Sequence, residues 1–169
     1  MKKIIVTGGS GFIGSNLVQF LLKKKYFVIN IDKSSYSANP YNVKKFKKNK
    51  NYLFFKLDIN ERKKIFKILK KYKPIGIFNL AAETHVDRSI DSAENFLKSN
   101  VFGVYNLLEV LRKLKKNRKK QIKLLHVSTD EVYGDLEKNK FAKENTVYNP
   151  SSPYSASKAS ADQLVKAYT

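Results

Sequence analysis

Short apolar runs alternate along the chain with longer segments in which apolar residues recur every three or four positions. The first run, residues 3–7, is β-branched and lacks polar alternation, and a helical pattern follows it. Such runs are typical of strands covered on both faces, and their alternation with helices predicts a parallel α/β sheet. The expected strands are residues 3–7, 27–31, 52–57, 75–80 and 122–127, and the expected helices are 12–24, 60–72, 91–116 and one that opens near Pro153.

Five strands with right-handed helical crossovers predict a Rossmann-type doubly wound sheet, ordered 3-2-1-4-5. Residues 33–50 are polar and lysine-rich, so we expect a long loop there with room for a short helix. No repeat or Gly/Ser linker indicates a second domain, so residues 1–169 are predicted to form one domain. The chain stops where the pattern would next supply a strand, and we expect it to be half of a longer protein.

The charge of the chain is strongly positive, with 34 Lys+Arg against 14 Asp+Glu and a formal net charge of +20. Such a charge suggests a polyanionic partner. Yet nearly all of the basic residues are lysines, which are spread over predicted loops and helix ends, whereas phosphate and base recognition favours arginine. A composition biased toward residues with A/T-rich codons is the favoured explanation, and nucleic-acid binding is the minor alternative.

The remaining composition narrows the class of protein further. The chain has no cysteine, which excludes disulfides and thiolate metal sites, and no metal site is expected. No apolar run approaches the roughly 20 residues that span a bilayer, and the N-terminus turns to glycine too early for a signal peptide. We therefore expect a soluble, cytoplasmic protein without membrane contact.

A glycine-rich segment, TGGSGFIGS, follows the first predicted strand and opens the first predicted helix. Its glycines Gly8, Gly11 and Gly14 have the spacing of a dinucleotide-binding loop. Gly8 permits a tight turn, Gly11 lets backbone N–H groups approach a pyrophosphate, and Gly14 lets the helix pack closely on the strand. The N-terminus of the helix then attracts the phosphates.

Asp32 ends the second strand, where a carboxylate can accept hydrogen bonds from the adenosine ribose. A carboxylate there repels a 2′-phosphate, so NAD is favoured over NADP, although Lys33 is adjacent. Asp58 and Ile59, at the end of the third strand, are candidates to flank the adenine. The alternative for Asp58 is an N-cap of the following helix.

Two polar clusters fall at or beside the carboxyl ends of strands, where open α/β sheets bind ligands. Thr129, Asp130 and Glu131 follow the fifth strand, and Tyr154 and Lys158 lie one turn apart at the start of the last helix. An ammonium beside Tyr154, together with an oxidised nicotinamide, favours the phenolate that a base requires. In isolation these would be a surface helix pair and a solvated loop pair, but the upstream glycine loop favours a catalytic site.

At this point the chain resembles the extended short-chain dehydrogenase/reductase superfamily through TGGSGFIGS and YSASK. Within it, LAAETHVDRSI and STDEVYG resemble the dTDP-glucose 4,6-dehydratase family, with Thr84 where that family usually has serine. The resemblance covers only the first half of that family's length and implies that the C-terminal substrate domain is absent. It implies a nucleotide-sugar substrate, and NAD as cofactor.

The resemblance also implies roles for individual residues. Tyr154, helped by Lys158 and Thr129, would remove the proton of the sugar 4-hydroxyl during oxidation at C4. Glu131 would take the C5 proton and Asp130 would protonate the departing 6-hydroxyl, which requires one ionised and one protonated carboxyl group. Epimerases of the superfamily carry small residues at positions 130 and 131, so a dehydratase is favoured over an epimerase.

Further positions follow from the same resemblance. Thr84, His85 and Thr129 are expected at the substrate, although His85 alone could be a structural histidine. Helices 91–116 and 153–168 are expected to form a homodimer interface. A non-catalytic NAD-binding remnant remains an alternative. The cofactor contacts are expected from Gly8, Gly11, Phe12, Ile13, Gly14, Asp32, Lys33, Ser34, Ser35, Asp58, Ile59, Leu80, Ala81, Ala82, Ser99, Tyr154 and Lys158.

Overall fold

The computed structural model describes residues 1–115 and 121–168. The chain divides into two compact units, and each is described by itself. The first comprises Met1–Ala81 and Asn106–Val127, and the second Ala82–Tyr105 and Ser128–Thr169. Within the described residues, no helix combines the length and the apolar character needed to cross a bilayer.

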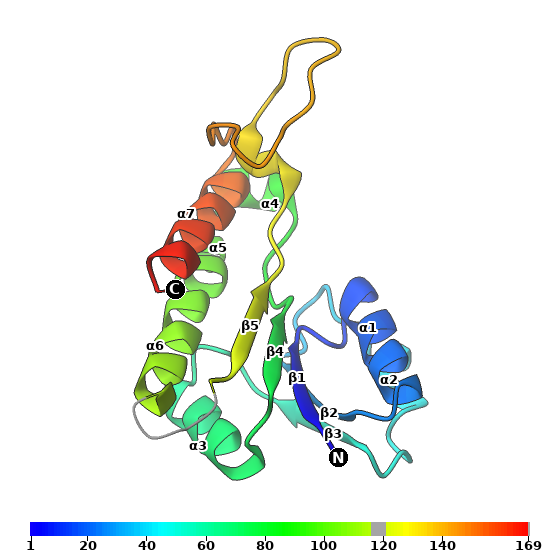
Figure 1. Cartoon of the computed structure of the whole chain (residues 1–169). Helices are drawn as coiled ribbons and strands as arrows, with labels where there is room; N and C mark the ends of the chain where they lie inside the picture. Colours follow the sequence, from blue (N-terminus) through cyan, green and yellow to red (C-terminus); the bar gives the residue numbers. More distant parts are fainter. Residues whose placement is uncertain (116–120, 169) are drawn as a thin grey trace. The chain divides into compact units, whose positions relative to one another are not determined.

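The first unit is a five-stranded parallel sheet in the order β3-β2-β1-β4-β5, as the sequence predicts. Its strands and helices are β1 (Lys3–Thr7), α1 (Phe12–Lys23), β2 (Phe27–Asp32), α2 (Pro40–Lys44), β3 (Tyr52–Lys56), α3 (Arg62–Tyr72), β4 (Gly76–Asn79), most of α6 (Gly103–Lys115) and β5 (Lys123–His126). This is the doubly wound Rossmann-type sheet, with helices on both faces (Figure 1).

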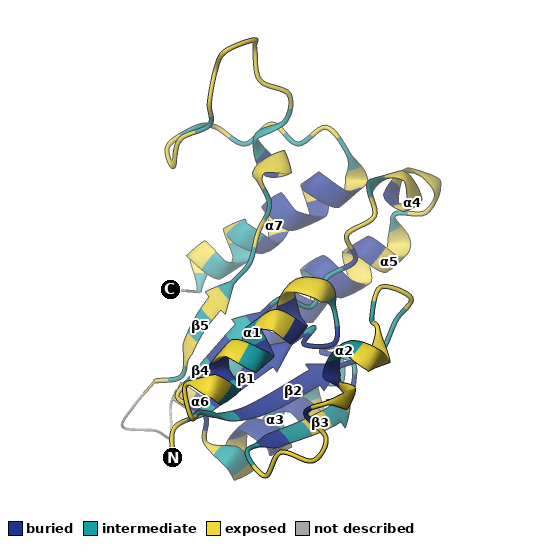
Figure 2. Ribbon diagram, turned by 90° about the vertical axis from the view of Figure 1, so that its right-hand side faces the viewer, coloured by how far each residue is buried: buried dark blue, intermediate teal, exposed yellow. Residues whose placement is uncertain are grey.

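Alternation along the central strand β1 supplies the two cores of this unit. Ile5 is fully buried against α3 and α6, in register with Ile29 of β2 and Ile77 of β4. Ile4 and Val6 point to the opposite face and pack with Val18 of α1 and other buried residues. Figure 2 shows the central strands buried and β5 largely exposed, in agreement with its alternating exposed and half-buried residues.

The second unit is built around α7 (Pro153–Ala167), together with the short helices α4 (Val86–Asp91) and α5 (Glu94–Phe96), the π-helical segment η1 (Leu97–Phe102) and the 3₁₀ turn η2 (Asp130–Tyr133). Residues 134–152 form a long loop, drawn in yellow to orange (Figure 1). Ser152 caps α7, since its hydroxyl accepts from the Ser155 N–H at 3.0 Å, and Pro153 occupies the first turn.

The single helix predicted over residues 91–116 is wrong in its first part. Ser92 is extended and separates α4 from α5, and the helix widens into the π-helical segment before it continues as α6. Asn100 lies in this segment, where it is 1% exposed and donates to the Glu83 carbonyl at 2.9 Å. Residue 116, the predicted end of this helix, lies outside the described residues.

Candidate active site

The glycine loop joins β1 to α1 with little room for side chains. Gly8 has a φ of +68°, which L-residues rarely adopt. A Cβ on Gly14 would lie 2.1 Å from the Gly8 carbonyl oxygen, whereas a Cβ on Gly11 would meet only that oxygen, at 3.4 Å. Gly8 and Gly14 are therefore required by the fold of the loop itself, and Gly11 leaves open space. Gly14 packs against this turn rather than against the strand.

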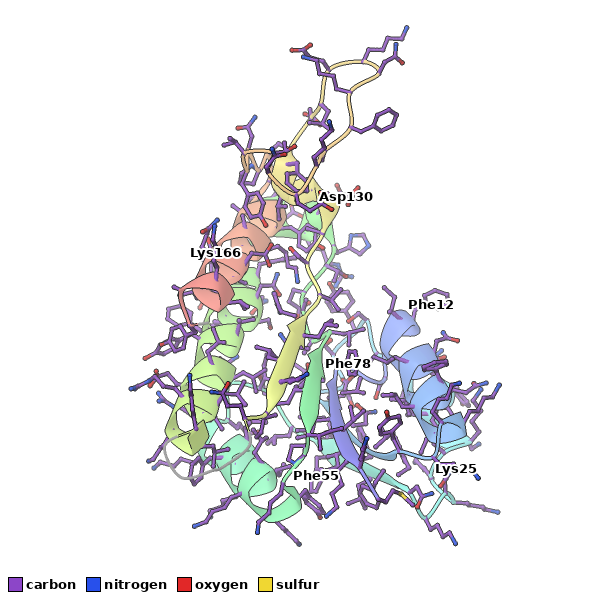
Figure 3. All side chains as sticks on the ribbon, viewed as in Figure 1. Phe12, Lys25, Phe55, Phe78, Asp130 and Lys166 are labelled. Atoms are coloured by element: carbon purple, nitrogen blue, oxygen red, sulfur yellow. The ribbon has the colours of Figure 1, made fainter. Side chains whose placement is uncertain are left out.

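The N-terminus of α1 meets the physical conditions for binding an anion. Gly11 is its N-cap, without a side-chain hydrogen bond, and the first turn contains no acidic residue. Phe12 and Ile13 follow, 81% and 64% exposed, and Phe12 is labelled at the start of α1 in Figure 3. A helix of this length with an uncapped N-terminus presents free N–H groups and a partial positive charge.

Asp32 is held at the end of β2 by the backbone on both sides of it. Its Oδ2 accepts from the Ser10 N–H at 2.9 Å, and its Oδ1 accepts from the Ser34 N–H at 2.7 Å. Asp32 is 7% exposed, and an ionised carboxylate retains further lone pairs for additional donors. Lys33, Ser34 and Ser35 are half-buried beside it.

The other predicted cofactor residues of this unit follow β3 and β4. Asp58 Oδ1 accepts from the Asn60 N–H at 2.8 Å, which is a turn ahead of α3 rather than its N-cap, since the N-cap is Glu61. Ile59 is buried. Leu80 and Ala81 are half-buried, and a Cβ on Gly8 would lie 2.8 Å from the backbone nitrogen of Ala81.

In the second unit, the structure brings Tyr154 together with the cluster that follows β5. Burial has the largest effect on the pKa of Tyr154 and raises it. A hydrogen bond with Thr129 lowers this pKa, and the negative charges of Glu131 and Asp130 raise it. The Thr129 hydroxyl also accepts from the Glu131 N–H at 3.3 Å. The pKa of Tyr154 is raised overall, so the activation of its phenolate by Lys158 and by the nicotinamide stays a prediction.

Tyr154 is anchored by its backbone and its ring. Its N–H donates to Ser89 Oγ at 3.0 Å, and its ring packs edge-on against Phe96 at a centroid distance of 6.3 Å. Only 7% of the residue is exposed. The phenol is therefore held in a fixed place, as a proton-transferring group requires.

Lys158 is 4% exposed, and its burial lowers the pKa of its ammonium group while the charge of Asp162 raises it. Of the remaining predicted residues in this unit, Thr84 and His85 are exposed, Ala82 is half-buried and Ser99 is buried. No group of three or more His, Cys, Asp and Glu side chains that could hold a metal ion occurs in the part of the chain that the structure describes.

Several residues that shape these sites carry no recognisable signal in the sequence. Asn100 accepts from the Glu83 N–H at 2.8 Å and donates to the Glu83 carbonyl and to Ser157 Oγ, both at 2.9 Å. In the first unit, the Ser10 N–H orients Asp32. The doublet Gly8-Gly9 was the available signal for a crowded turn, and no sequence pattern marks Asn100 or Asp162.

The comparisons with known proteins cover nearly the whole chain. The model of the GDP-mannose 4,6 dehydratase family matches residues 5–169. A dTDP-glucose 4,6-dehydratase of Haemophilus influenzae is 47% identical over 99% of this chain and 52% of its own length. The resemblance to dTDP-glucose 4,6-dehydratases is thereby confirmed for the N-terminal half.

Solved structures agree with the sequence relatives. A dTDP-glucose 4,6-dehydratase of Bacillus anthracis, in complex with NAD, matches with a TM-score of 0.87 and 42% identity over 99% of this chain and 50% of the other. A UDP-glucose 4-epimerase of Thermus thermophilus, also with NAD, matches with a TM-score of 0.86 and 29% identity over 98% and 50%. The chain spans about half the length of the curated relatives it matches. By its family match over residues 5–169, the chain belongs to the GDP-mannose 4,6 dehydratase family.

Proposed function

We propose that this chain is the NAD-binding, catalytic half of a dTDP-glucose 4,6-dehydratase, a hydro-lyase that forms dTDP-4-keto-6-deoxyglucose. The observation that carries the proposal is the cluster of Thr129, Asp130 and Glu131 around the buried Tyr154. Oxidation of the sugar requires a base, for which Tyr154 is proposed. The following loss of water requires a general base and a general acid, for which Glu131 and Asp130 are proposed. The 47% identity to a dTDP-glucose 4,6-dehydratase supports this substrate.

NAD is the proposed cofactor, and residues 1–169 its binding domain. The uncapped N-terminus of α1 would hold the pyrophosphate, and the fixed Asp32 carboxylate would accept from the ribose hydroxyls. When bound, NAD supplies a temporary acceptor for a hydride of the sugar. The remaining predicted contacts, including Phe12, Ile13, Asp58, Ile59, Leu80, Ala81, Ala82 and Ser99, are proposed on the family resemblance.

The residues of the chain itself would move three protons. Tyr154 accepts the proton of the sugar 4-hydroxyl, with Thr129 and the Lys158 ammonium favouring its phenolate. Oxidation at C4 acidifies the C5 proton, which the Glu131 carboxylate removes. Asp130 in its acid form protonates the 6-hydroxyl, which leaves as water. Thr84 and His85, both exposed, are proposed to contact the substrate.

The test combines cofactor binding with turnover. Purified chain is titrated with NAD by calorimetry and then incubated with NAD and dTDP-glucose, and the 4-keto-6-deoxy sugar is followed by its alkaline absorbance. Turnover in the wild type, and its loss in E131Q, would support the proposal. E137Q is the matched control, since Glu137 forms an exposed ion pair with Lys140 at 2.7 Å in the same region of the chain.

A second candidate is a non-catalytic NAD-binding protein, in which the uncapped N-terminus of α1 and the fixed Asp32 carboxylate would serve cofactor binding alone. It predicts NAD binding without product. Interconversion of UDP-glucose and UDP-galactose without dehydration would favour an epimerase instead. Binding to DNA at low salt, lost steeply as salt increases, would revive the nucleic-acid alternative, which we do not adopt.

We further propose that the chain is a cytoplasmic homodimer that pairs through the helices of residues 91–116 and 153–168. Leu97, Phe102 and Tyr105 support this interface, because they are 47%, 58% and 37% exposed at neighbouring positions of one helical stretch. Light scattering should give twice the chain mass for the wild type and a monomer for F102D. A wild-type monomer would contradict the proposal.

A further inference from the structure

Asp162 accepts hydrogen bonds from the hydroxyl groups of two residues outside its own helix. Its Oδ2 accepts from the Tyr148 hydroxyl at 3.2 Å and also from the Ser128 hydroxyl. Tyr148 belongs to the long loop before α7, and Ser128 directly precedes Thr129. One carboxylate on α7 thus holds both ends of the segment between β5 and α7.

The contact with Ser128 bears on the candidate catalytic cluster. Thr129, the next residue, caps the turn that carries Asp130 and Glu131, and its hydroxyl bonds with Tyr154. Ser128 is exposed, and its hydroxyl donates to the Asp162 carboxylate. The contact between Ser128 and Asp162 therefore holds the residue that directly precedes the cluster.

Asp162 also lies one helical turn after Lys158, on the same face of α7. Lys158 is 4% exposed, and burial alone would favour its neutral amine. The Asp162 charge acts in the opposite direction on the pKa of Lys158. Lys166, one turn further along and labelled in Figure 3, is exposed and could compete as a cation for the same carboxylate.

We propose that Asp162 is a positioning residue of the Tyr154–Lys158 site, whose carboxylate fixes Ser128 ahead of Thr129 and keeps the buried Lys158 as an ammonium. The catalytic meaning of this role rests on the proposed function. The two contacts of Asp162 make it more than a surface carboxylate: without it, the cluster loses an anchor and Lys158 loses the charge opposite its own.

The direct test measures the titration of Lys158 by NMR on lysine-labelled chain, with K158M identifying the resonance. The pKa of Lys158 should fall in D162N and return toward the wild-type value in D162E, which restores the charge. Y148F and K166M are the matched controls, because both leave the Asp162 charge in place, and neither should move the titration. An unchanged Lys158 titration in D162N, or a shift in K166M as large as that in D162N, would overturn the proposal.

A second measurement covers the anchoring role and remains available if D162N does not fold. S128A removes only an exposed hydroxyl, and amide hydrogen exchange at Glu131 should accelerate in it, while exchange within α1 stays unchanged. Exchange equal to that of the wild type would contradict the anchoring role.

Neither measurement needs turnover, so a failed dehydratase assay and a failed Asp162 proposal are distinguished. In an active chain, D162N should lower kcat about tenfold or more and leave KM within about twofold, and an unchanged kcat would contradict the proposal.

Discussion

The buried side chain of Asn30 lies directly against Gly9, so that a Cβ at position 9 would be 2.3 Å from Asn30 Oδ1. Asn30 has no exposed surface, and its amide donates to the Tyr52 hydroxyl at 2.9 Å. Within the described residues its Oδ1 has no hydrogen-bond partner. The second glycine of the loop is therefore required by the strand beneath it, whatever the loop binds.

G9A should destabilise the chain by about 1–3 kcal/mol, because the buried, hydrogen-bonded Asn30 cannot move aside. Urea denaturation measures this loss. G11A is the matched control, since its Cβ would only touch the Gly8 carbonyl oxygen at 3.4 Å, and its stability should stay within about 0.5 kcal/mol of the wild type.

NAD affinity separates the two glycines further. G11A should weaken NAD binding although it folds normally, because it fills space proposed for the pyrophosphate.

The double variant G9A/N30A should lose less stability than the two single losses added together, since shortening Asn30 opens the space. Additive losses would show that the contact between positions 9 and 30 is not the cause.

Asp32 is predicted to serve the loop as well as the cofactor. In D32N one of the two backbone donors, from Ser10 or Ser34, would face an amide nitrogen in place of an acceptor. A buried donor that loses its partner costs about 1–3 kcal/mol. D32N should therefore reduce the urea midpoint and NAD affinity together. A variant of unchanged stability with weakened NAD binding would mean that the carboxylate acts on the cofactor alone.

The sheet was predictable because each strand is marked by the residues of that strand alone. β1 and β2 are short runs in which apolar residues predominate, with Asn30 as an interior polar residue of β2. Parallel strands joined by right-handed crossovers leave few possible orders, so both the strands and their order in the sheet agree with the prediction. The glycine loop was predictable for the same reason, since it follows β1 without interruption. The correct positions of β3 and β4 came from equally simple runs.

The π-helical segment and the polar contacts could not be predicted from periodicity. Apolar residues in 91–116 keep an approximate helical spacing through the segment Leu97–Phe102, so the pattern does not register a wider turn. The polar Asn100 lies within the segment, and its partners are 17 and 57 residues away in the chain, beyond the reach of any helical pattern. Asp162 was missed likewise, because its partner Ser128 is 34 residues distant.

N100A should destabilise the chain by about 2–4 kcal/mol, because it leaves the buried N–H of Glu83 without its acceptor and removes two further bonds. N106A is the control, because Asn106 is half-buried and donates to Asn60 at 3.1 Å; it should cost less than about 1 kcal/mol. Chemical denaturation compares the two. A loss in N100A no larger than that in N106A would mean that the Asn100 bonds do not support the second unit.

Lys158 is expected to cost the chain stability in return for its proposed catalytic role. Its pKa is lowered by burial, so the ammonium form is disfavoured in the folded protein relative to the unfolded chain. K158M keeps much of the length of the side chain and removes the charge, and it should raise the free energy of unfolding by about 1 kcal/mol while abolishing any turnover.

The pH dependence of this difference follows from the direction of the shift. Between the folded pKa of Lys158 and its ordinary value of 10.5, the unfolded chain binds more protons than the folded one, so the wild type gains stability relative to K158M as pH rises. The advantage of K158M should be complete at pH values below the folded pKa of Lys158 and shrink toward pH 10.5. Urea denaturation of both variants over this range measures it, and tyrosine titrations common to both cancel in the comparison. If K158M is the less stable protein at pH 7, then Asp162 and the other neighbours of Lys158 more than offset the cost of burying its charge.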